Sequence, residues 1–141
     1  MFKNILIPID GSANSRHALA QAVQLANESG PEVHVTVFHV NHLAPITEFS
    51  LQMGPEQMGE AEGEAILKDA DSLLAEAHFP YEKVTVWGDP AQEICLKAKE
   101  LQCDLIVMGN RGRSLVEELV LGSVSHKVLQ QGHCTVLIVR R

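Results

Sequence analysis

The chain has 141 residues, 45% of them hydrophobic and 21% charged, which is the composition of an ordinary globular protein, and we expect one domain over residues 1–141. A chain of this length buries roughly two thirds of its unfolded surface, so its core requires neither a metal nor a disulfide. The formal net charge of −7 disfavours nucleic acid as a partner.

The first ten residues, MFKNILIPID, contain a short apolar run at 3–9 that predicts a buried strand. The run is too short for a signal peptide or a membrane span, so we expect a cytoplasmic protein without membrane insertion. A helix should follow, with Ser12 or Asn14 as its N-cap and Gly30-Pro31 after its end. A second buried strand is predicted at 33–40.

Residues 41–58 contain two prolines and no clear period, which predicts a long loop. This loop is either a lid or partner surface, or plainly disordered. Periodicity then predicts a helix at 59–78 and an alternating, edge-like strand at 83–87. A third helix should begin after Asp89 as N-cap, with Pro90 in its first position and Leu101 among its inward residues.

A fourth strand is predicted at 104–108 and a fifth at 135–139. The helix between them should run from about Gly122 to Gly132, with Val124, Val128 and Leu129 facing inward. Strands and helices alternate strictly, which indicates a doubly wound α/β fold. The expected sheet is parallel and five-stranded, in the order 3-2-1-4-5. Ligands bind such sheets beyond the carboxyl ends of the strands.

Cysteines and histidines suggest no metal site. The three cysteines form no CxxC pair and lie in apolar surroundings, so we expect reduced thiols that serve as small hydrophobes: Cys95, Cys103 and Cys134. His39 and His42 are close in sequence, but a strand end followed by a loop would not aim both rings at one point.

A ligand-binding site is expected where the first and fourth strands end. Gly109 and Gly112 would let backbone N–H groups approach an anion, and Gly122-Ser123 would place a helix N-terminus and a hydroxyl beside it. Arg111 would add positive charge. Asp10 is suited to accept hydrogen bonds from ribose hydroxyls or an adenine amine. Together these residues favour a nucleotide.

Simpler explanations remain open for each of these residues. The glycines could mark turns, Ser123 could cap the fourth helix, and Asp10 could cap the first. The chain contains neither GxxxxGK[ST] nor GxGxxG, which argues against a Walker-type ATPase and a dinucleotide dehydrogenase.

The whole chain, from KNILIPIDGS through DLIVMGNRG to LGSVSHKVLQQGHCTVLIVRR, closely resembles the universal stress protein family. Its Gly-x2-Gly-x9-Gly-Ser spacing resembles the ATP-binding branch of that family. The resemblance implies adenine and ribose contacts from Pro8, Ile9, Asp10 and Val40, with Met108 as the floor of the pocket. It implies phosphate contacts from Gly109, Arg111, Gly112, Gly122, Ser123, Val124 and Ser125.

The resemblance also implies a homodimer formed by antiparallel pairing of the last strand, 135–139, and action on a partner such as a transporter or kinase. Any Mg²⁺ is expected on the ATP phosphates. Glu117 and Glu118 are expected on a solvated face, so hydrolysis should be slow at most and no catalytic residue is assigned. Thr135 departs from the family's usual proline after Cys134, which affects only local strand geometry.

Overall fold

The structure is a computed structural model that describes residues 2–42, 55–110 and 122–140. Strands and helices alternate along the described residues, as the sequence predicts. The strands are β1 (Asn4–Pro8), β2 (His34–Asn41), β3 (Tyr81–Trp87), β4 (Leu105–Gly109) and β5 (Thr135–Val139). The helices are α1 (Ala13–Glu28), α3 (Pro55–Leu74), α4 (Pro90–Glu100) and α5 (Ser123–Gln131).

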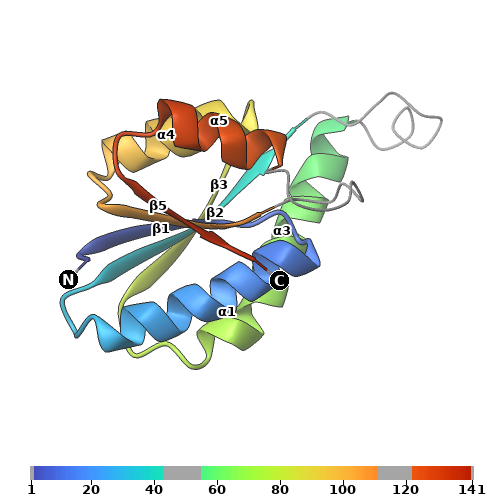
Figure 1. Cartoon of the computed structure of the whole chain (residues 1–141). Helices are drawn as coiled ribbons and strands as arrows, with labels where there is room; N and C mark the ends of the chain where they lie inside the picture. The colour runs from blue at the N-terminus through green and yellow to red at the C-terminus, as the bar shows by residue number, and fades with distance from the viewer. Residues whose placement is uncertain (1, 43–54, 111–121, 141) are drawn as a thin grey trace.

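The five strands form one parallel sheet in the order β3-β2-β1-β4-β5, which confirms the predicted topology. Helices α1 and α3 cover one face of the sheet, and α4 and α5 cover the other (Figure 1). The strand predicted to be edge-like, β3, is an edge of the sheet, and β5 is the other edge. The winding reverses between β1 and β4, so their carboxyl ends lie next to each other at the place where such sheets bind ligands.

The core lies on both sides of the sheet because successive strand residues point to opposite faces. Ile5 and Ile7 of β1 pack toward Leu19 of α1, on the side that α1 and α3 cover. Leu6 lies on the opposite face, where it packs in a cluster with Phe38 and with residues of α4 and α5. Both faces of β1 are therefore buried, which explains its uninterrupted apolar sequence.

Side chains cap α1 and α4 at their first turns. The Ser12 hydroxyl accepts a hydrogen bond from the Ser15 N–H (3.1 Å), so Ser12 is the N-cap of α1 and Asn14 is not. The Asp89 carboxylate accepts from the Gln92 N–H (3.0 Å), with Pro90 in the first helical position as predicted. Each such cap contributes about 1 kcal/mol to stability. The cap on α1 also fixes the chain just after β1, where the candidate site begins.

Helix α3 covers 55–74 rather than the predicted 59–78. Its end is set by Asn27 of α1, whose side chain accepts from the His78 N–H (2.8 Å) and donates to the Glu76 carbonyl (2.9 Å). The bond from the His78 N–H takes a backbone group that a helix continuing to 78 would use internally. The start at Pro55 also shortens the predicted loop, of which residues 43–54 lie outside the described residues.

Two residues predicted to face inward are exposed. Leu101 is the C-cap of α4 and is 37% exposed, and Leu129 of α5 is 42% exposed. The neighbouring Val128 takes the position that faces the sheet and is fully buried. Within the ranges that the structure describes, no helix has the length and apolarity needed to cross a membrane.

Candidate functional site

Most of the predicted site residues gather at the carboxyl edge of the sheet. They come from the end of β1, the end of β2, the end of β4 and the first turn of α5: Pro8, Ile9, Asp10, Val40, Met108, Gly109, Gly122, Ser123, Val124 and Ser125. Val40 and Met108 are almost fully buried and belong to the core cluster on the α4/α5 face of the sheet. Arg111 and Gly112 lie outside the described residues, as do Glu117 and Glu118.

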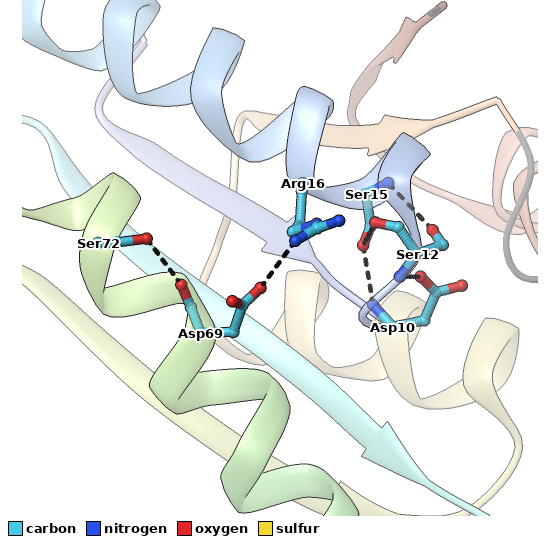
Figure 2. Close-up of polar contacts among 6 residues, drawn as sticks. All are labelled: Asp10, Ser12, Ser15, Arg16, Asp69 and Ser72. Carbon is cyan, nitrogen blue, oxygen red and sulfur yellow. Dashed lines mark hydrogen bonds and ion pairs between the residues drawn. The ribbon is translucent and has the colours of Figure 1, made fainter.

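Asp10 lies in a tight turn between β1 and α1 (Figure 2). Its Oδ1 accepts a hydrogen bond from the Ser12 N–H (2.9 Å), and its own N–H donates to the Ser15 hydroxyl oxygen (3.3 Å). The Ser15 hydroxyl in turn donates to the Ser12 carbonyl (3.1 Å). Asp10 is therefore not the N-cap of α1. Its carboxylate is held by the turn in a partly exposed position, and a carboxylate can accept several hydrogen bonds at once.

A buried histidine of β2 forms a hydrogen bond with Ile9, the residue just before this turn. The His39 Nδ1 lies 2.8 Å from the Ile9 carbonyl oxygen, and since a carbonyl only accepts, Nδ1 must carry the hydrogen. The Ile9 N–H donates to the Phe38 carbonyl (2.8 Å), so both sides of Ile9 are fixed to β2. Sequence reasoning considered His39 only as a metal ligand and missed this role. Among the described residues, no group of three histidine, cysteine or acidic side chains is arranged to hold a metal.

The end of β4 is joined to the start of α5 by a buried serine and one backbone bond, and to β5 by a second backbone bond. The Ser125 hydroxyl lies 2.9 Å from the Gly109 carbonyl and 3.2 Å from the Asn110 carbonyl, and Ser125 is only 3% exposed. The Gly122 N–H donates to the Asn110 carbonyl (2.8 Å), and the Asn110 N–H donates to the Val139 carbonyl (3.2 Å). The Ser125 hydroxyl is thus engaged by backbone, which leaves its N–H as the group suited to a ligand.

The N-terminus of α5 has the features of an anion site. Gly122 is its N-cap, and no side chain among the described residues makes a capping bond there, so Ser123 is the first helical residue and not the cap. The first N–H groups of a helix have no intrahelical partner, and the helix dipole gives this end partial positive charge. The exposed Ser123 hydroxyl lies beside these N–H groups. Such an end binds phosphate or carboxylate.

The two described glycines of the motif differ, because the structure shows a reason for glycine at 109 but not at 122. A Cβ at Gly109 would lie 2.9 Å from both the carbonyl carbon and the carbonyl oxygen of Asn14, so this glycine lets α1 pack against the end of β4. The expected role of Gly109, admitting an anion to its backbone, is therefore not what forbids a side chain there. Gly122 has φ −60° and ψ 157°, which any residue can adopt. Its backbone conformation gives no reason for glycine.

Asn41 and Gly63 form a second close contact near this edge, which sequence reasoning also missed. Asn41 is 4% exposed, and a Cβ at Gly63 of α3 would lie 2.5 Å from its Oδ1. Within the described residues this Oδ1 has no hydrogen-bond partner. The glycine therefore lets α3 lie directly on the end of β2. A glycine inside a helical pattern was the one signal in the sequence for this contact.

The sequence and the fold of this chain are similar to those of known proteins. The universal stress protein family matches residues 1–140. The universal stress protein YxiE of Bacillus subtilis is 42% identical over 99% of this chain and all of its own length. Among solved structures, a universal stress protein in complex with cAMP is 28% identical, with a TM-score of 0.73 over 98% of this chain and 97% of its own. UspA from Lactobacillus plantarum is 23% identical, with a TM-score of 0.80 over 98% and 97%, and shares the fold. The chain belongs to the universal stress protein family.

Proposed function

We propose that this protein binds ATP at the carboxyl edge of the sheet and acts as a regulatory binding protein rather than as an efficient enzyme. The observation that carries the proposal is the N-terminus of α5, which lacks a side-chain cap among the described residues and is tied to the end of β4 through Gly122 and Ser125. Phosphates would bind the N–H groups of this first turn and the Ser123 hydroxyl. Arg111 and Gly112 would complete the phosphate site.

The base and sugar would lie toward β1 and β2. Val40 and Met108 lie on the face of the sheet that α4 and α5 cover, close to its carboxyl edge. Helix α5 begins on the same face, so a base in contact with these two residues would direct its phosphates toward α5. Asp10 and the backbone of Pro8 and Ile9 would contact the ribose and adenine. A relative of the same fold, 28% identical, has been solved with cAMP, which is support for an adenine nucleotide. That the nucleotide is ATP, with Mg²⁺ bound to its phosphates, is part of our proposal and goes beyond this comparison.

Equilibrium dialysis of the purified protein against ATP and Mg²⁺ tests this proposal. We expect saturable binding at one site per chain, weaker binding of AMP, and weaker binding again of adenosine, because phosphate contacts are lost in that order. Ser123→Ala should weaken ATP binding by roughly tenfold, the cost of one hydrogen bond to a charged group. Binding of all three ligands with equal affinity would contradict the phosphate site.

The same samples separate binding from hydrolysis. We expect ATP to be recovered intact after dialysis apart from slow turnover. Steady Mg²⁺-dependent release of phosphate that is lost in Asp10→Ala would instead identify a weak ATPase on this scaffold. If neither binding nor turnover is found, a protein that acts only through its surfaces becomes the better explanation.

Regulation would require protein contacts, and we propose a cytoplasmic homodimer paired through β5. This strand is an edge of the sheet, and in residues 2–42, 55–110 and 122–140 no other strand pairs with its outer side. Leu137 on it is 42% exposed. Light scattering should give twice the mass of the chain. Leu137→Lys should shift the protein toward the monomer, whereas Leu96→Lys, at a leucine on α4 that is also exposed (52%), should not. A monomeric wild type would refute this interface. A regulated transporter or kinase would bind the dimer.

A further inference from the structure

Two cysteines lie next to each other at the amino ends of β4 and β5, on the edge of the sheet opposite the candidate nucleotide site. Cys103 comes two residues before β4, and Cys134 comes directly before β5. Both are free thiols, half-buried, and packed against the core cluster between the sheet and helices α4 and α5. The third cysteine, Cys95 of α4, packs against the same cluster.

The register of the two strands brings Cys103 and Cys134 close enough to bond. Leu105 is paired with Thr135, so Cys134 is level with residue 104 and one step from Cys103 across the strand pair. Parallel strands lie about 4.8 Å apart and rise about 3.3 Å per residue, and continuing this spacing to the residues just before the two strands gives a Cα separation of roughly 6 Å. Besides burial, Cys134 also raises the pKa of the Cys103 thiol, which agrees with a short separation. Disulfides span Cα separations of about 4.4–6.8 Å.

The local backbone turns Cys103 toward the same side as Cys134. Gln102 has φ 54°, a left-handed conformation that turns the chain from the end of α4 into β4. The Cys103 N–H then donates to the Ala98 carbonyl of α4 (2.8 Å). Since both cysteines pack on the α4/α5 face, no change of sheet pairing is needed to join them.

We propose that Cys103 and Cys134 form a reversible intrachain disulfide when the surroundings become oxidising. With a small-molecule disulfide as the oxidant, one protein thiolate attacks a sulfur of the oxidant and releases one thiol. The second protein thiolate then attacks the mixed disulfide and releases the other. The two protein thiols lose two electrons and two protons, and the oxidant becomes two thiols. The reverse exchange with excess thiol restores the starting state.

The surroundings of these thiols determine how fast the bond can form. Burial raises the pKa of the Cys103 thiol to about 11, and the neighbouring Cys134 and Asp104 act in the same direction. Burial also raises the pKa of the Cys134 thiol. Since the thiolate is the attacking species, exchange should be slow at neutral pH and should accelerate as the pH rises. The uncharged disulfide does not carry this desolvation cost.

The bond would close a loop over residues 103–134, which contains the end of β4 and the start of α5. Cross-linking a loop of this size restricts the unfolded chain, so the oxidised protein should have a melting temperature higher by on the order of 5–10 °C. This inference does not depend on nucleotide binding.

Mass spectrometry after treatment with glutathione disulfide at mildly alkaline pH tests the proposal. Under denaturing conditions we expect a single wild-type chain, not linked to another by a disulfide, that has lost two hydrogens. We also expect a single peptide pair linking Cys103 to Cys134, and return to the starting mass with excess dithiothreitol. Cys95→Ser should behave as the wild type. Cys103→Ser and Cys134→Ser should instead carry glutathione as a mixed disulfide or remain unmodified, without the internal link.

Three outcomes would overturn the proposal. They are a link from Cys95 to Cys134, disulfides only between chains, and glutathione adducts without an internal link. The peptide map of the wild-type protein decides among them without any variant, so a serine variant that folds poorly does not affect the result. Circular dichroism before oxidation identifies such a variant.

Discussion

Gly109→Ala is expected to lower the free energy of unfolding by about 2–3 kcal/mol, the cost of overpacking a close-packed site. The added Cβ would lie 2.9 Å from the carbonyl carbon and the carbonyl oxygen of Asn14. These are backbone atoms in the first turn of α1, so a side-chain rotation cannot relieve the clash. The helix must move away from the end of β4. Urea denaturation followed by circular dichroism measures this loss.

Gly30→Ala is the matched control for that substitution. Gly30 has φ 97°, and a Cβ there would meet nothing within 4 Å, so alanine would suffer only from the unfavourable backbone conformation. The expected loss is about 1 kcal/mol. If Gly109→Ala is no more destabilising than Gly30→Ala, α1 does not pack against β4 as closely as described. Close packing against Asn14 would then not explain the glycine at 109.

Gly122→Asp should weaken ATP binding by at least a hundredfold while the protein stays folded. Aspartate is a preferred N-cap residue, and Gly122 already has a backbone conformation that aspartate adopts readily. The carboxylate would take the first-turn N–H groups of α5 for itself and would repel the phosphates, and like charges placed together cost several kcal/mol. Dialysis against ATP measures the affinity, and thermal unfolding should give a midpoint at or above that of the wild type.

Gly122→Asn separates charge from bulk because its side chain has nearly the same shape without the charge. We expect a smaller loss of affinity, roughly tenfold, since asparagine competes less strongly for the same N–H groups. Equal losses in both variants would mean that steric blocking explains the effect and that the anion site is unsupported. Unchanged affinity in both would place the ligand elsewhere.

The contrast between these two glycines could not be predicted from the sequence. Their spacing marked both as one motif, and both were expected to serve the phosphates. The reason for glycine at 109 is a contact with Asn14, almost a hundred residues earlier in the chain, which only the packing of α1 on β4 reveals. At 122 the φ and ψ values were needed to see that the backbone conformation does not require glycine.

Element order and sheet topology were predictable because β-strands buried on both faces leave long apolar runs. The last strand was predicted with the observed bounds, 135–139, and the start of α4 was marked by Asp89 and Pro90. The end of α3 was not predictable because Asn27, on another helix, accepts from the His78 N–H, a backbone group that would continue it. Val128 and Leu129 were both predicted to face inward, and only Val128 is buried, because periodicity alone does not choose between adjacent residues.

The predicted topology was enough to bring the described site residues to the carboxyl edge of the sheet, but their contacts with one another could not be predicted. Asp10 and the glycines were found because they follow strands, where ligands of this fold bind. The bond from His39 to Ile9 and the hydroxyl of Ser125 facing the Gly109 carbonyl depend on side-chain directions that no local pattern encodes. Assignment of the residues to ATP, and of the chain to one domain, stays a prediction.

Titration of ¹⁵N-labelled protein with ATP tests directly whether the first turn of α5 binds phosphate, because NMR gives a separate signal for each backbone N–H group of that turn. We predict that the signals of Ser123, Val124 and Ser125 shift in a saturable way with ATP, that those near Asp10 shift as well, and that adenosine moves only the latter. Nucleotide binding at this edge would be contradicted by either of two results. One is that no signal at the start of α5 shifts under saturating ATP, and the other is that shifts occur only on surfaces away from the carboxyl edge of the sheet.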